Sequence, residues 1–126
     1  MNAQEQANNA IRWIDTLPSY KQAPKGSRGR LGNELIGFCC FGAGCIELGI
    51  DYLSTNSYSE DFQFAVGLIH LEGFFAKGVT YCNEHSLSGV NDSTEEGFEN
   101  ISKLMKNHPE WMFNPEAAKA IKRHYS

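Results

Sequence analysis

Apolar residues recur every three or four positions over residues 3–17. This spacing places them on one face of a helix, as in the amphipathic helices of globular proteins. Because proline disfavours the helical conformation in the residue before it, Pro18 is expected to end this helix. The stripe consists of Ala7, Ala10, Ile11, Ile14 and Leu17, with Trp13 on its flank.

A second apolar run covers residues 35–50 and places hydrophobic side chains on nearly all sides of a helix. Such a helix is expected at the centre of a core. We expect it over residues 34–48, with Asn33 as the N-cap and Gly49 as the C-terminal stop. The preceding residues 18–32 are rich in proline and glycine, which predicts a loop.

The pattern is ambiguous between residues 56 and 82. Phe62, Phe64 and Val66 alternate as in a strand, whereas Phe62, Val66 and Ile69 also fit a helix. Periodicity alone leaves both alternatives open. We favour a helical turn near 60–66, followed by a β-hairpin.

Two further helices are predicted near the C-terminus. Ser93 and Glu96 have the spacing of a capping box, which predicts a helix from there to about Asn107. Asn114 is expected to cap a fourth helix, with Pro115 in its first turn.

These elements predict one domain over residues 1–126. Its expected class is α+β and mainly helical, with about four helices around the buried central helix 34–48. A short β-hairpin is expected in the 66–85 region. A chain of this length supports one hydrophobic core.

Composition narrows the classes of function. The chain is 41% hydrophobic and 21% charged, which is typical of a globular protein. A formal net charge of -4 argues against non-specific binding to nucleic acid. The N-terminus is polar, and glycines and Glu47 interrupt the longest apolar run, so we expect neither secretion nor a membrane span. The cytoplasm is the expected location, and homo-oligomerisation is a reasonable expectation.

Charge is distributed unevenly, with basic ends that flank an acidic middle. Residues 31–102 carry eleven acids and one base, Lys77. The basic ends favour either solvated surface or a local pocket for an anionic ligand. The N-terminal bases are Arg12, Lys21, Lys25, Arg28 and Arg30, and the C-terminal ones are Lys103, Lys106, Lys119, Lys122 and Arg123.

Cysteine and histidine residues raise the question of a metal site. Cys39, Cys40, Cys45, Cys82 and His85 include a C-x₂-H pair, and zinc binds four such ligands. The segment lacks the usual C-x₂-C knuckle, so buried structural thiols are favoured. We therefore expect no metal, no cofactor and no catalytic residue, because no nucleophile–base or paired-carboxylate motif stands out.

Polar and aromatic residues in two predicted loops, with one at the end of the first helix, form the candidate ligand-binding set. Tyrosine and tryptophan rings can stack on a base, asparagine and aspartate can bind a ribose, and lysine and arginine can bind a phosphate. The set consists of Trp13, Tyr20, Lys21, Gln22, Arg28, Arg30, Asn91 and Asp92.

Two blocks of the sequence resemble a family of small phage and prophage proteins, whose patterns read W…YKQ…G.L…YCCLG..C and L..LND.G..F..I. The blocks depart from these patterns at Phe38, where Tyr is usual, and at Val90, where Leu is usual. The resemblance implies a phage origin and the cytoplasm of a host cell. The segments that carry the resemblance, departures included, are Trp13, Tyr20-Lys21-Gln22, Gly29-Arg30-Leu31, Phe38-Cys39-Cys40-Phe41-Gly42, Cys45, Leu87-Ser88-Gly89-Val90-Asn91-Asp92-Ser93, Phe98 and Ile101.

Three hypotheses for function follow. The first is a non-enzymatic counter-defence protein that sequesters a small anionic, nucleotide-like signalling molecule. The second is a protein-interaction inhibitor that blocks a host defence protein. The third is a small zinc-binding or hydrolytic protein.

Overall fold

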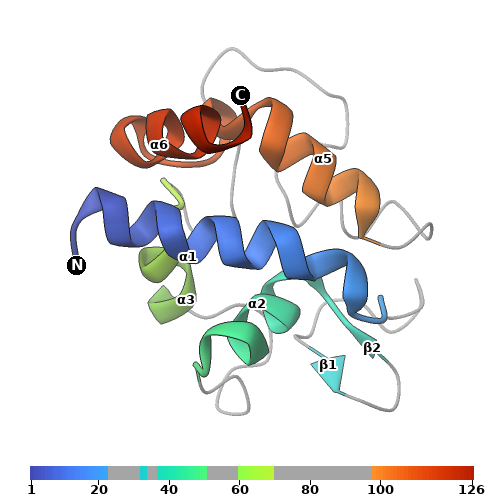
Figure 1. Cartoon of the computed structure of the whole chain (residues 1–126). Coiled ribbons are helices and arrows are strands. Elements are labelled where there is room, and N and C mark those ends of the chain that lie inside the picture. The colour runs from blue at the N-terminus through green and yellow to red at the C-terminus, as the bar shows by residue number, and fades with distance from the viewer. Residues whose placement is uncertain (23–31, 34–36, 51–59, 70–97) are drawn as a thin grey trace.

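The computed structural model describes residues 1–22, 32–33, 37–50, 60–69 and 98–126 (Figure 1). Helices make up most of this part of the chain. In order, its elements are α1 (Ala3–Thr16), η1 (Leu17–Ser19), β1 (Gly32–Asn33), β2 (Gly37–Phe38), α2 (Cys40–Leu48), α3 (Glu60–Val66), α5 (Glu99–Asn107), η4 (Pro109–Trp111) and α6 (Pro115–Tyr125).

Helix α1 is the central element of the fold. It begins where the Asn2 side chain accepts a hydrogen bond from the backbone N–H of Glu5 at 2.8 Å, which satisfies a donor of the first turn. Its buried stripe contacts α2, α3, α5 and α6. In Figure 1 it crosses the middle of the molecule, with α5 and α6 on one side and α2 and α3 on the other. The expectation that residues 34–48 form the central helix is therefore wrong.

The predicted α+β class is also wrong, because helices build most of the described part of the chain. Its sheet consists of β1 and β2 alone, an antiparallel pair of two residues each, with Gly32 opposite Phe38. These strands lie before α2 and not in the 66–85 region. Within the described ranges, five α-helices pack together where about four were expected. Residues 70–85, where most of the hairpin was predicted, lie outside the described residues.

The start of α2 differs from the prediction because of contacts made by the residues before it. Asn33 belongs to β1 and does not cap the helix. The backbone N–H of Phe38 donates to the carbonyl oxygen of Lys21 at 2.8 Å, which holds this residue in an extended conformation. The helix then begins at Cys40, with Cys39 as the N-cap.

Helix α3 resolves the ambiguity of the middle segment in favour of the helical turn. Phe62 and Val66 are one helical turn apart and both are fully buried, whereas Phe64 points outward. Beyond the helix, Leu68 forms an isolated antiparallel bridge with Phe113 in place of a hairpin strand.

Local signals at helix ends were predicted well. Gly49 has a left-handed φ of 70° after α2, as expected for a C-terminal stop. Asn114 caps α6 by accepting a hydrogen bond from the N–H of Ala117 at 2.9 Å. Helix α5 ends at Asn107 as predicted, whereas the Ser93–Glu96 capping box lies outside the described residues.

The core is centred on the indole ring of Trp13, which is fully buried. The ring of Phe62 meets it edge-on with centroids 4.8 Å apart, and Phe41 and Phe113 lie at 6.1 and 6.5 Å. Such aromatic pairs stabilise a core beyond the area that they bury. Gly44 allows this packing, because a Cβ there would overlap the Phe62 ring and lie 3.0 Å from Trp13 Nε1.

We expect Gly44→Ala to lower the melting temperature. Alanine ordinarily stabilises a helix by about 1 kcal/mol relative to glycine, so a fall in the melting temperature would be opposite to the effect of helix propensity. Overpacking against Phe62 should outweigh that gain and cost about 1–3 kcal/mol. Thermal unfolding of Gly44→Ala, alone and combined with Phe62→Leu, checks this. A higher melting temperature for the single variant, or no recovery in the double variant, would contradict the proposed packing.

Candidate functional site

The sequence-predicted ligand set is only partly brought together. Trp13 is fully buried, and its Nε1 donates to the carbonyl oxygen of Cys40 at 2.9 Å. Its ring therefore has no exposed face on which a base could stack, and we remove it from the candidate set. Arg28, Arg30, Asn91 and Asp92 lie outside the described residues.

Tyr20, Lys21 and Gln22 follow η1 in a segment that runs beside β2. Gln22 forms a bridge with Phe38, and the Tyr20 ring meets the Phe38 ring edge-on at 6.0 Å. Lys21 is exposed, whereas Tyr20 and Gln22 are half-buried. These contacts give the segment a role in joining η1 to β2.

The Tyr20 hydroxyl is held by a charged cluster that joins α1 to α2. It donates to Glu47 Oε2 at 2.8 Å, and Arg12 Nε donates to Glu47 Oε1 at 2.9 Å. The hydrogen bond from Arg12, with that from Tyr20, lowers the pKa of the Glu47 carboxyl below its ordinary value of 4.5. Burial, together with the neighbouring Glu47 carboxylate, raises the pKa of Tyr20 to about 12. Tyr20 thus acts as a structural donor at neutral pH.

The described cysteines lie inside the fold. Cys39, Cys40 and Cys45 are buried thiols, and Cys39 Sγ accepts from the N–H of Gly42 at 3.4 Å, which caps α2. Within the described ranges, no three or more His, Cys, Asp or Glu side chains are placed to hold a metal ion. Cys82 and His85, the other members of the zinc hypothesis, lie outside those ranges.

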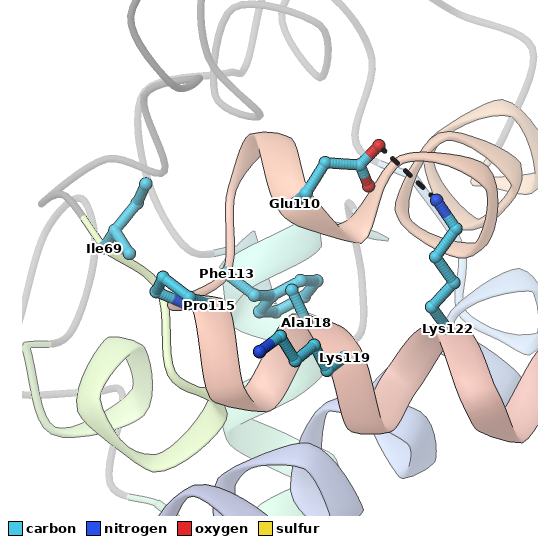
Figure 2. A pocket seen from close by; sticks show the side chains of 7 residues that line it. All are labelled: Ile69, Glu110, Phe113, Pro115, Ala118, Lys119 and Lys122. Carbon is cyan, nitrogen blue, oxygen red and sulfur yellow. Dashed lines mark ion pairs between the residues drawn. The ribbon is translucent and has the colours of Figure 1, made fainter.

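A pocket of about 390 Å³ lies beside α6 and was not predicted from the sequence. Its apolar floor is formed by Phe113, Pro115 and Ala118, and Figure 2 shows Glu110 and Lys122 to one side of these residues, with Lys119 beside Ala118. The lining residues are Ile69, Glu110, Phe113, Pro115, Ala118, Lys119 and Lys122.

Three tertiary contacts build this pocket from segments far apart in the sequence. The bridge between Leu68 and Phe113 brings the end of α3 to the turn before α6. The N–H of Ile69 donates to the carbonyl oxygen of Met112 at 3.0 Å, which fixes Ile69 at the pocket edge. The N–H of Asn114 donates to the carbonyl oxygen of Gly67 at 2.7 Å.

The charged edge of the pocket comes from α6 and η4. Lys122 Nζ lies 4.0 Å from Glu110 Oε1, the pair drawn in Figure 2, and Lys119 Nζ lies 3.8 Å from Glu116 Oε1. The lysine side chains are 66% and 71% exposed, so both ion pairs are weak. A ligand anion can therefore replace either carboxylate at small cost.

One sequence signal for this pocket was available. Pro115, Ala118, Lys119 and Lys122 have the spacing of one helix face. The sequence assigns both lysines to the basic C-terminal end, for which solvated surface and a local pocket for an anionic ligand both remain open. That face could not be paired with Ile69 without knowledge of the fold.

Comparisons with protein-family models, curated proteins and solved structures found no match. Among the described residues, no helix is long and apolar enough to cross a membrane. The fold and the pocket define a mainly helical chain with an amphiphilic surface site.

Glu47→Gln should make the stability of the protein less dependent on acidic pH. Because the carboxyl has a lower pKa in the folded than in the unfolded state, it stabilises the fold at any pH above its unfolded-state pKa. This stabilisation is lost as the pH falls through the folded-state pKa. We expect a loss of about 0.5–1 kcal/mol at neutral pH. The decline of unfolding free energy between about pH 5 and pH 3 should be shallower than in the unmodified chain.

Urea unfolding across this pH range checks the prediction. Asp61→Asn, which changes an exposed carboxylate on α3, is the control. Equal pH profiles for Glu47→Gln and the unmodified chain would show that the cluster does not stabilise the fold.

Proposed function

We propose that this chain captures a small anionic molecule and holds it without converting it, with the α6 pocket as the binding site. One observation carries the proposal: two lysine side chains stand at the edge of an apolar pocket of about 390 Å³. Small-molecule sites are typically concave and mostly apolar, with a few polar groups that orient the ligand.

The chemistry of the lining residues supports binding without turnover. General acid–base catalysis needs a group whose pKa suits proton transfer, and covalent catalysis needs a nucleophile beside a base. Among the described residues, the polar side chains that line the pocket are two exposed lysines and the carboxylate of Glu110. They can attract and orient an anion, and the exposure of both lysines favours ion pairing with a ligand over covalent catalysis.

A counter-defence role is part of the same proposal and draws on the resemblance to small phage proteins. In that setting the chain acts in the cytoplasm of the host and removes a signalling molecule by stoichiometric capture. Such a role needs tight binding and no chemical conversion.

A second candidate function, the binding of a protein partner, is favoured by Phe64. This side chain is 60% exposed on α3. Met1 is exposed as well, and its Sδ accepts from Asn9 Nδ2, which also donates to the carbonyl oxygen of Ala65 on α3. An apolar surface of this kind is typical of a contact with another protein.

Native mass spectrometry and calorimetry of the full chain with a panel of small anions test the first proposal. We expect one ligand per chain, recovered with unchanged mass. Lys119→Met with Lys122→Met should weaken binding about tenfold, because two charge contacts are lost while the apolar stems are kept.

Lys103→Met, which removes an exposed charge from α5, is the matched control and should bind as the unmodified chain does. A converted product would contradict capture without turnover. Failure of every anion to bind, together with a stoichiometric protein partner lost in Phe64→Ser, would favour the second candidate.

A further inference from the structure

The backbone of the pocket floor offers few hydrogen bonds to a ligand. The N–H of Phe113 donates to Pro109 at 2.9 Å, and that of Ala118 donates to Asn114 at 2.8 Å. The N–H of Ile69 is likewise used, and Pro115 has none. Recognition of a nucleobase requires donors as well as acceptors along its edge, and the backbone N–H groups of these residues supply no free donor.

The size of the pocket suits a compact hydrocarbon body. A cavity of about 150 Å³ lined by apolar side chains binds benzene. The volume here is about 390 Å³, so two fused aromatic rings, or a chain of roughly eight to ten carbons, would fit in it and leave room for a polar head. Burial of such a body against Ile69, Phe113 and Ala118 supplies the hydrophobic part of the affinity.

The charge at the pocket edge suits one anionic group. Lys119 and Lys122 are accompanied by the carboxylates of Glu116 and Glu110. A ligand anion that displaces Glu110 from Lys122 leaves that carboxylate beside His108, whose Nδ1 lies 3.7 Å away. A polyphosphate would bring further negative charge close to both glutamates, and like charges repel.

We infer that the captured molecule is an amphiphile with one anionic head, a carboxylate or a phosphate, on an aliphatic or aromatic hydrocarbon body. This inference rests on the proposed function and names its ligand class. The sequence predicted a nucleotide-like ligand. The pocket instead favours a molecule whose hydrocarbon body needs no hydrogen bonds. The head lies between Lys119 and Lys122, and the body lies on the apolar floor.

Calorimetric titrations of the full chain with 2-naphthoate, its neutral counterpart 2-naphthalenemethanol and adenosine monophosphate test the ligand class. We expect the naphthoate to bind about tenfold more tightly than the alcohol, because the neutral alcohol lacks the charge contacts with both lysines. Adenosine monophosphate should bind at least tenfold more weakly than the naphthoate. Naphthyl phosphate in a parallel titration identifies which anionic head is preferred.

Variants test the placement of head and body separately. In Lys119→Met with Lys122→Met, the preference for the acid over the alcohol should disappear, whereas Lys103→Met should keep it. Ala118→Leu fills the floor and should weaken both naphthyl ligands about tenfold or more. If the melting curve of Ala118→Leu shows that this variant does not fold, Ile69→Asn takes its place, because Ile69 is only half-buried at the pocket edge. This variant should weaken both naphthyl ligands as well.

The outcomes separate the inference from the proposed function. Tighter binding of adenosine monophosphate than of naphthoate, dependent on the two lysines, would keep the function and overturn the ligand class. Naphthoate binding that neither the lysine nor the floor variants change would overturn the site. Failure of all these anions, and of the wider panel, would overturn both.

Discussion

The burial of Trp13 is the constraint on which the other described contacts depend. Its indole N–H needs a partner inside the core, and the carbonyl oxygen of Cys40 supplies one at the first residue of α2. The ring also meets Phe62 of α3 and Phe113 of the segment before α6. One side chain of α1 thus sets the positions of three other segments.

A second set of contacts carries that arrangement to the pocket. Asn114 accepts from the N–H of Ala117, and its Nδ2 donates to Gln6 Oε1 at 2.9 Å. Gln6 Nε2 donates in turn to the carbonyl oxygen of Phe64 at 2.7 Å. Asn114 therefore caps α6 and ties its start to both α1 and the end of α3. Since Gly67 has a φ of 78° and lies against Asn114, the chain can turn there and bring Ile69 to the pocket edge.

The pocket combines a fixed floor with an adaptable edge. Phe113 and Ala118 are buried, and their backbone groups are bonded within the fold, so the floor needs little rearrangement on binding. Lys119 and Lys122 are long, exposed side chains whose present ion pairs are weak. Such a division favours binding, because the apolar surface is ready and the charges can move to a ligand.

The sequence by itself determined the features that depend on neighbouring residues. Helix α1, the Asn114 cap of α6, the glycine stop after α2 and the end of α5 follow from periodicity and capping chemistry within a few residues. These local patterns do not predict contacts between residues that are distant in the sequence. Phe38 is extended because its N–H bonds to Lys21, and this moved the start of α2 away from the predicted Asn33.

The candidate site depended still more on tertiary structure. Trp13 has the chemistry of a stacking residue, and only its packing against Phe62 and Cys40 assigned it to the core. Conversely, the spacing of the α6 lysines placed them on one helix face, but only the position of Ile69 beside Phe113 made that face part of a pocket. Local sequence encodes which face a helix presents, whereas a pocket requires knowing what lies opposite that face. That information is held in hydrogen bonds and packing between residues more than forty positions apart.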